Sequence, residues 1–257
     1  MQLSRLYLGN ILEIFELEAD MKIILVGSTG RMGRAITARA AEFSCEIYPL
    51  GKSDDISKLQ GDVIIDFSSL EGCKTAISIS SKLKIPLVVG TTGLTDELLE
   101  SLDQLSKVVP VLVAANTSVG VTALLSLVEN AAKLLGKDWN VEISEIHHTK
   151  KVDSPSGTAL ALLDAVNSGR GEMPVVHGRS GHVGARPKNE IGMHAIRGGS
   201  VIGEHTVYFF SEGERIEITH QAQNRDIFAD GSIQAAKWLA AKGRANGMYK
   251  MKDVIQG

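Results

Sequence analysis

The sequence of 257 residues has little of what marks several protein classes. Its two cysteines, Cys45 and Cys73, form no CxxC pair, so neither a disulfide scaffold nor a cysteine-based zinc site is expected. No run reaches the roughly 18–20 apolar residues of a membrane-spanning helix. A net charge of −3 indicates no nucleic-acid surface. There is no repeat or low-complexity tract either.

The remaining composition is that of an intracellular enzyme. With 44% hydrophobic and 22% charged residues, the chain can bury a core and does not suggest disorder. Few cysteines fit a reducing compartment, so we expect a cytoplasmic location. Residues 1–20 carry one arginine against four acids, which fits neither a secretory signal nor an arginine-rich transit peptide. We treat them as an extension, with Met21 as a candidate natural start.

A glycine turn follows the first apolar strand. Residues 21–36 read MKIILVGSTGRMGRAI, in which the strand runs into Gly27, Gly30 and Gly33 and then into a helix. Such glycines allow a tight turn and a close approach to a pyrophosphate, whose charge is met by the helix N-terminus. A turn that only packs a helix on a strand is the alternative, but the βαβ-like series that follows favours a nucleotide site.

Further strands are expected at about 45–50, 62–68, 86–93 and 110–118, with helices between them. The helix at 95–107 has Thr95 as a plausible N-cap. Strands that are apolar throughout suit a parallel sheet covered on both faces, and ligands bind at the carboxyl ends of such strands. The residues at those ends, which we expect on the nicotinamide side of the cofactor, are Gly90, Thr91, Thr92, Ala114, Ala115 and Asn116. For the GTTG segment, turn formation alone is the alternative.

The most specific stretch is EIHHTKKVDSPSGTA, residues 145–159. His147 and Lys151 offer a proton, while His148, Lys150 and the backbone N–H groups around Gly157 and Thr158 offer an anion cradle. Two adjacent histidines alone would be typical of a solvated strand end, but the whole string predicts a site for a small anionic substrate. No metal site is expected, because neighbouring side chains on a strand point to opposite faces and no second cluster supports one.

In the second half, a helix at 119–136 precedes strands at 141–147, 193–198, 205–210 and 215–222. Their period of two predicts an open sheet with one face packed and one face available. The loop from 169 to 190 either closes over the substrate or is solvated and mobile. Arg197, Gly198 and Gly199 either face the substrate or form a strand-end turn.

Together these motifs resemble the 4-hydroxy-tetrahydrodipicolinate reductase family, the dihydrodipicolinate reductases of bacterial and plant lysine biosynthesis. The similarity spans residues 21–257 and rests on GSTGRMG, VGTTG, AANTSVGV, EIHHTKKVDSPSGTA, IRGGSVIGEHTV and GERIEITHQAQNRDIFADG. It implies that His147 and Lys151 carry the chemistry and that His148, Gly157 and Thr158 contact the substrate. The implied cofactor contacts are Gly27, Ser28, Thr29, Gly30, Arg31, Met32, Gly90, Thr91, Thr92, Ala114, Ala115, Asn116 and Thr117.

The resemblance also implies an architecture. The predicted fold is α/β, a Rossmann-like doubly wound parallel sheet plus an inserted α+β substrate domain with an open mixed sheet. We expect the N-terminal extension at 1–20, a dinucleotide-binding domain at 21–118 and 227–257, and a substrate-binding and oligomerisation domain at 119–226. In the family the open sheets pair into a homotetramer, whereas a helix or loop covering the sheet within one chain is the alternative.

The implied reaction is NAD(P)H-dependent reduction of 4-hydroxy-tetrahydrodipicolinate to tetrahydrodipicolinate with loss of water, in the diaminopimelate route. The substrate is a cyclic imine with two carboxylates. Hydride addition pushes electron density toward the ring nitrogen, so a proton donor there lowers the barrier, and either His147 or Lys151 gives that proton. The rivals are another two-domain reductase, such as an amino-acid dehydrogenase, and a nucleotide-sensing module, which would need no proton donor.

The cofactor choice depends on the end of the second strand. An NAD-specific fold usually carries an acid there, but here Gly51, Lys52 and Ser53 follow the strand. Lys52, with Arg31, would meet a 2′-phosphate, which favours NADPH while allowing NADH; a plain surface charge is the alternative for Lys52. Relatives show an acid at this place, and an aromatic residue where this chain has Thr117.

Overall fold

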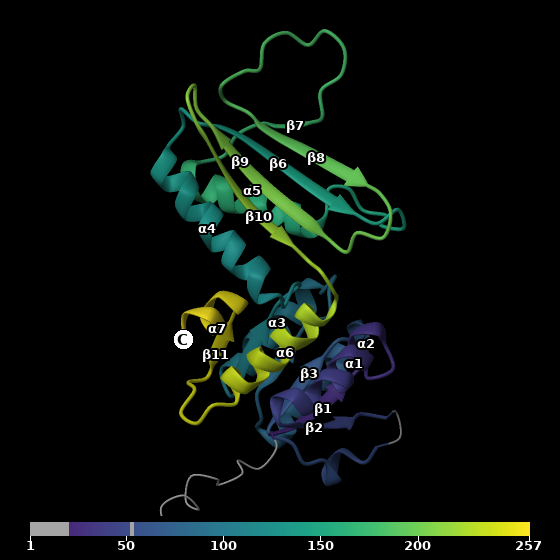
Figure 1. Cartoon of the computed structure of the whole chain (residues 1–257). Coiled ribbons are helices and arrows are strands. Elements are labelled where there is room, and N and C mark those ends of the chain that lie inside the picture. Colours follow the sequence, from purple (N-terminus) through teal and green to yellow (C-terminus); the bar gives the residue numbers. More distant parts are fainter. Residues whose placement is uncertain (1–20, 52–53) are drawn as a thin grey trace, which may run out of the picture.

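A computed structural model describes residues 21–51 and 54–257 (Figure 1). The predictions for residues 1–20 and for Lys52 lie outside the described residues. In chain order the elements are β1 (Met21–Val26), α1 (Arg31–Arg39), the 3-10 helix η1 (Ala40–Phe43), β2 (Cys45–Pro49), η2 (Ile56–Lys58), β3 (Val63–Asp66), α2 (Leu70–Leu83), β4 (Leu87–Val89), α3 (Asp96–Ser106), β5 (Pro110–Val113), α4 (Val119–Leu135), β6 (Asn140–His147), α5 (Gly157–Arg170), β7 (Val175–His177), β8 (Ile191–Arg197), β9 (Glu204–Phe210), β10 (Arg215–Gln221), α6 (Asp226–Leu239), β11 (Gly247–Tyr249) and α7 (Met251–Gln256).

The first sheet is parallel and buried on both faces. Its order is β11-β5-β4-β3-β1-β2, with every neighbouring pair parallel. Side chains of α1, α6 and α7 pack in one core layer, and those of α2 and α3 pack in the other. Burial on both faces explains why β3 and β4 are apolar at almost every position. The predicted Rossmann-like sheet is therefore confirmed.

Serine and threonine caps fix where most of the long helices begin. The side chains of Ser69, Thr95, Ser118 and Ser156 accept a backbone N–H in the first turn of α2, α3, α4 and α5 respectively. The cap predicted at Thr95 is thus present. Helix α1 differs, because its cap residue is Gly30 and no side chain caps it. Its first-turn N–H groups stay available for another acceptor.

The second sheet is mixed and has one covered face. Its order is β10-β9-β6-β8-β7, in which β6 lies antiparallel to β9 and parallel to β8. Helices α4 and α5 lie on one face, as Figure 1 shows, and their apolar side chains pack against β6, β8 and β9. Residues of β6 and β9 alternate between buried and half-buried along the whole strand. This is the open sheet that the period of two predicts. No helix of the described residues is long and apolar enough to cross a membrane.

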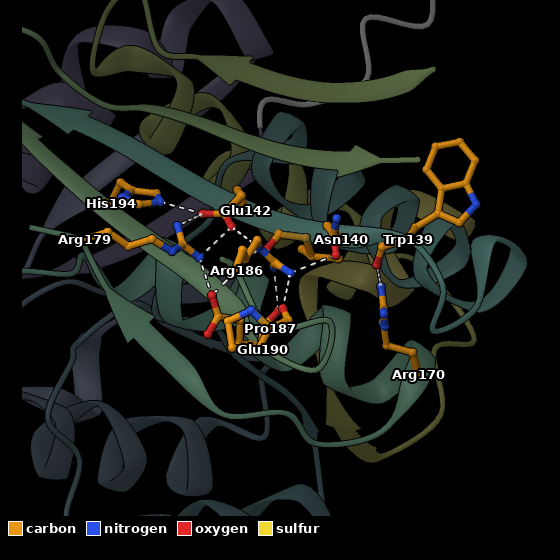
Figure 2. Close-up of polar contacts among 10 residues, drawn as sticks. Trp139, Asn140, Glu142, Arg170, Arg179, Arg186, Pro187, Glu190 and His194 are labelled. Atoms are coloured by element: carbon orange, nitrogen blue, oxygen red, sulfur yellow. Dashed lines mark hydrogen bonds and ion pairs between the residues drawn. The ribbon is translucent and has the colours of Figure 1, made fainter. Parts of the chain in front are cut away.

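The stretch from 169 to 190 is not one loop, in contrast to the prediction. Helix α5 continues to Arg170, and Val175–His177 forms strand β7 beside β8. Beyond β7 the chain is fastened to the sheet by two arginines (Figure 2). Arg179 donates to Glu142 and Glu190, and Arg186 donates to Glu142 and to the backbone carbonyl of Glu190.

The carboxylate of Glu142 accepts hydrogen bonds from both arginines. Burial would raise its pKa, but hydrogen bonds from Arg179, His194 and Arg186 outweigh burial and hold the pKa at about 2. The carboxylate therefore stays charged at neutral pH and ties both ends of the β7–β8 loop to β6. Neither arginine's role was readable from spacing, because Glu142, the strand residue that both bind, lies 37 residues before Arg179 and 44 before Arg186.

Candidate active site

The glycine turn after β1 has no room for side chains. A Cβ on Gly27, whose φ is +87°, would lie 2.2 Å from the carbonyl oxygen of Phe67. A Cβ on Gly33 would lie 2.3 Å from the carbonyl oxygen of Gly27. The turn is closed by a hydrogen bond of 3.0 Å from the Gly30 N–H to that same carbonyl. The backbone therefore packs tightly at the start of α1, where the uncapped N–H groups fit a pyrophosphate.

The other predicted turn residues lie around this opening. Thr29, Gly30 and Arg31 are exposed, and Ser28 is half-buried. Met32 packs against the core below the turn. The exposed backbone and the cationic side chain of Arg31 are thus on the solvent side, where a cofactor would lie.

The loop after β4 is tied down from beneath. Thr91 is 8% exposed, and its hydroxyl donates to Asp66 at 2.8 Å while accepting the Ser68 N–H at 2.9 Å. Burial raises the pKa of Asp66, opposed by hydrogen bonds from Ser68 and Thr91. Gly90 lies against the ring of Phe67, where a Cβ would be 2.2 Å from the ring carbons. Of the predicted residues in this loop, Thr92 is the one whose side chain is exposed.

The loop after β5 connects the two sheets. Ala114 is buried and its N–H bonds the Val89 carbonyl, whereas Ala115 is exposed. The side-chain amide of Asn116 donates to the Thr158 hydroxyl at 3.3 Å. The side chain of Thr117 points away, because its hydroxyl donates to the Phe228 carbonyl at 2.7 Å. A predicted cofactor residue and a predicted substrate residue therefore lie within contact.

A buried imidazole–carboxylate pair stands at the end of β6. His147 is 8% exposed and Glu145 is 0% exposed. The His147 Nδ1 lies 2.5 Å from Glu145 Oε2. Residues two apart on a strand share a face, so the strand itself brings the two side chains together. Since an ionised carboxylate only accepts hydrogen bonds, Nδ1 carries the proton in this pair.

Two other residues complete the shell around Glu145. Arg197, at the end of β8, donates from both terminal nitrogens, each at 2.7 Å from one carboxylate oxygen. The Ser156 N–H, just before α5, donates at 3.0 Å. Burial alone would raise the pKa of Glu145, but the bonds from Arg197 and His147 outweigh burial and leave the pKa below its usual value. Arg197 is the last residue of β8 and a turn follows at Gly199, so the strand-end turn is present, while the Arg197 guanidinium binds Glu145.

His205 lies against His147 from β9. The rings meet edge to face with centroids 5.1 Å apart, and His205 Nε2 lies 3.0 Å from the Ser156 hydroxyl. Burial, with the nearby His147 adding to the effect, lowers the pKa of His205 to about 4. Burial also lowers the pKa of His147, which the opposing pull of Glu145 does not offset. Both rings are therefore neutral at pH 7.

The remaining predicted residues line the turn into α5. Gly157 is exposed and Thr158 half-buried in the first turn, and no described residue accepts their N–H groups. His148 is half-buried, and its Nδ1 has no partner among the described residues. The Lys151 ammonium lies 2.8 Å from both oxygens of Asp153. To reach another group, this ammonium has to leave that carboxylate.

Sequence reasoning did not assign roles to Glu145, Ser156 or His205. The spacing of Glu145 and His147 was a usable signal, since an i, i+2 pair on a strand shares a face. Ser156 was visible only as a helix cap. His205 gave no signal, because its contact with His147 depends on the pairing of β9 with β6.

The lowered pKa of His205 predicts a loss of stability in mild acid. In the unfolded chain this histidine takes up a proton near pH 6.5, whereas in the folded chain it does so only near about 4. Between these values the unfolded state binds more protons, so the free energy of unfolding falls as the pH drops, by roughly 3 kcal/mol in full. Urea unfolding from pH 7 to pH 4 measures this slope. His205→Gln is expected to flatten it, whereas His182→Gln on the exposed loop leaves it unchanged. Equal slopes in all three proteins would contradict the assignment.

The doubly wound sheet with its glycine turn, and the buried imidazole beside a helix start, are features expected of an α/β oxidoreductase that uses a pyridine nucleotide. The family description "Dihydrodipicolinate reductase, N-terminus" matches residues 21–117, and "Dihydrodipicolinate reductase, C-terminus" matches residues 120–255. The chain belongs to the dihydrodipicolinate reductase family.

Individual relatives are similar in sequence to this chain along nearly its whole length. The 4-hydroxy-tetrahydrodipicolinate reductase of Zymomonas mobilis is 43% identical over 251 residues, 93% of this chain and 98% of its own. That of Clostridium tetani is 42% identical over 250 residues, 91% of this chain and 97% of its own. Among solved structures, the dipicolinate-bound dihydrodipicolinate reductase of Paenisporosarcina sp. TG-14 matches with a TM-score of 0.72 at 22% identity, covering 90% of this chain and 97% of that one. At this identity the structural match shows the fold.

Proposed function

We propose that this chain reduces 4-hydroxy-tetrahydrodipicolinate to tetrahydrodipicolinate with loss of water, the reaction named for its relatives, in the diaminopimelate route of lysine biosynthesis. One observation carries the proposal. Asn116, at the carboxyl end of β5, contacts Thr158 in the first turn of α5, and the same helix start is bonded to the partner of His147. A bound nucleotide and a proton-transferring group would therefore act on one molecule.

The chain's own residues would divide the work between binding and proton transfer. The first-turn N–H groups of Gly157 and Thr158, with the ring of His148, would hold the substrate carboxylates. His147 and Lys151 would handle the proton that the ring nitrogen needs. When bound, the pyridine nucleotide supplies the hydride. Because His147 is neutral with its proton on Nδ1, the ammonium of Lys151 is the stronger candidate for the initial donor.

We further propose use of both nucleotides, with a preference for NADPH. Arg31 lies exposed at the glycine turn, on the side where a 2′-phosphate would lie. The carboxylate of Asp54, however, accepts the Gly51 N–H at 2.7 Å, so an acid does stand near the end of β2. An acid there suits the free ribose hydroxyls of NADH. The ratio of kcat/KM for the two nucleotides measures the balance.

The decisive experiment follows nucleotide absorbance with the condensation product of pyruvate and aspartate semialdehyde as substrate. The proposal expects oxidation of NADPH at a rate that depends on this substrate. An amino-acid dehydrogenase would instead show turnover with an amino acid and the oxidised nucleotide. A nucleotide sensor would bind NADPH without consuming it, and either result would overturn the proposal.

We propose a homotetramer assembled through the open face of the second sheet. Ile196 is 49% exposed there, and Tyr208 and Phe210 stack on each other on the same face of β9. Analytical ultracentrifugation is expected to give about four times the chain mass of 27.5 kDa. Ile196→Glu would place charges within the paired sheets and shift the mass toward smaller species, whereas Leu134→Glu, on an exposed part of α4, would not. A monomer for the unaltered chain would contradict the tetramer.

A further inference from the structure

We propose that Glu145 is a positioning residue, which fixes the tautomer and the direction of the His147 ring and locks that ring to the start of α5. The inference deepens the proposed function and rests on it. Glu145 would touch neither substrate nor cofactor, because it is 0% exposed and surrounded by protein. Its effect would pass through His147.

The carboxylate is fully occupied, and each bond has a fixed direction. Oε1 accepts the Ser156 N–H and one Arg197 nitrogen, at 3.0 and 2.7 Å. Oε2 accepts the other Arg197 nitrogen at 2.7 Å and His147 Nδ1 at 2.5 Å. All four donors point at acceptor-only oxygens, so neither the carboxylate nor the imidazole can rotate without losing a buried bond.

This arrangement determines which nitrogen of His147 is reactive. With the proton held on Nδ1, Nε2 has a bare lone pair and no partner among the described residues. It faces Gly203, where a Cβ would come within 3.0 Å of Nε2, so the missing side chain leaves that nitrogen open. A ring in the other tautomer would turn an acceptor toward Glu145 and a donor toward Gly203.

Arg197 and Ser156 connect the Glu145 carboxylate to elements other than β6. One Arg197 nitrogen also donates to the Asp153 carbonyl at 2.7 Å, within the segment that leads into α5. Ser156 caps α5 through its hydroxyl while its N–H is bound to Glu145. The carboxylate therefore joins the ring on β6, the end of β8 and the first turn of α5. The proton-transferring atom and the anion cradle would be held at a fixed separation, as efficient catalysis requires.

The electrostatic surroundings are mixed and come from several elements. The groups facing the pair are Arg197 from β8, His205 from β9, and Lys151 with Asp153 from the segment before α5. His220 from β10 acts on His205. None of these groups is bonded to His147 Nδ1, whose partner is the negatively charged Glu145.

Glutamine at position 145 is the sharpest test. In Glu145→Gln an NH2 group would replace one carboxylate oxygen. Each oxygen now accepts two hydrogen bonds, so in either orientation of the amide the new NH2 would face N–H donors instead of acceptors. His147 is the one partner able to adapt, by moving its proton to Nε2. The expected result for Glu145→Gln is a kcat/KM lower by about 10²-fold or more, carried by kcat, with the NADPH Kd unchanged. The inflection of the pH profile that belongs to His147 is expected to move to lower pH.

A second readout does not need turnover. Nitrogen-15 spectra of histidine-labelled protein, with the His147 signal assigned by its loss in His147→Gln, report the tautomer directly. The unaltered chain is expected to show protonated Nδ1 and bare Nε2, and Glu145→Gln the reverse. Should Glu145→Gln not fold, Glu145→Asp serves instead, because it keeps the charge for Arg197 but draws the carboxylate back from the ring.

Glu142 offers a matched control. It lies on the same strand, on the opposite face, and also binds two arginines and a histidine (Figure 2). Glu142→Gln is expected to leave the pH profile and the His147 tautomer as they are. If Glu145→Gln or Glu145→Asp kept both the tautomer and the profile in an enzyme whose unaltered form turns over, the positioning role would be refuted. Absence of turnover in the unaltered chain would refute the proposed function instead. The tautomer measurement would still test whether Glu145 fixes the proton on His147 Nδ1.

Discussion

Replacing His147 and Lys151 together by alanine is expected to lower kcat/KM by at least about 10³-fold, because well-placed proton transfer alone typically contributes about 10²–10⁴-fold. The variant would also lose the positive charge of Lys151, which acts on His147 and would offset the negative charge of the substrate. The NADPH Kd should stay near its original value, because neither side chain belongs to the glycine turn. Steady-state kinetics and fluorescence titration measure the two quantities separately.

A histidine and a lysine elsewhere provide the control. His182 and Lys188 are both exposed in the β7–β8 loop, so their double alanine variant removes the same groups without touching the string. Its kcat/KM should remain within about twofold of the original, as for surface substitutions in general. Undiminished turnover in the His147→Ala, Lys151→Ala variant would remove the proposed mechanism.

Gly27→Ala is expected to raise the NADPH Kd by about 10²-fold or more and to lower the melting temperature. A side chain at a φ of +87° costs about 1–2 kcal/mol in backbone strain. The larger effect comes from space, because the new Cβ would lie 2.2 Å from the Phe67 carbonyl oxygen and force the turn away from β3. The N–H groups at the start of α1 would move with the turn. Isothermal titration with NADPH and thermal unfolding report both effects.

Gly136→Ala tests the effect of backbone strain in the absence of a steric clash. Gly136, after α4, also has a positive φ, +67°, but a Cβ there meets nothing within 4 Å. This variant should lose about 1–3 kcal/mol of stability and no nucleotide affinity, because Gly136 lies outside the left-handed helical region, at a ψ of −165°. If Gly27→Ala bound NADPH as well as Gly136→Ala does, the turn would not be the nucleotide site.

Much of the fold was readable because the two sheets leave different patterns. Continuous apolar runs marked β3 and β4, and alternation marked β6 and β9. The strands that the sequence missed are short edges: β7 and β11 have three residues each. Three residues are too few to show a period, and their pairing with β8 and β5 depends on tertiary placement.

The sequence indicated the reactive residues of the candidate site but not the residues that hold them in place. The string at 145–159 named the candidate proton donors and the helix start, because reactive side chains crowded at one turn are unusual. The supporting partners come from β8 and β9, at separations of 52 and 49 residues. Sheet register determines those contacts, and register could not be derived from local spacing. The ion pair between Lys151 and Asp153 was also visible only in the structure, because it depends on the conformation of an irregular segment that no local pattern predicts.

The two arginines of the β7–β8 loop have a consequence for how this region tolerates change. Arg179 and Arg186 pin the segment at both sides of residues 180–185, which include Gly181 and Gly184 at positive φ with open space around them. Because the pinned ends already close the loop, a few added residues cost only a small further loss of entropy. Length variation and inserted epitopes should therefore be accommodated at this tip without loosening the strands that carry His147.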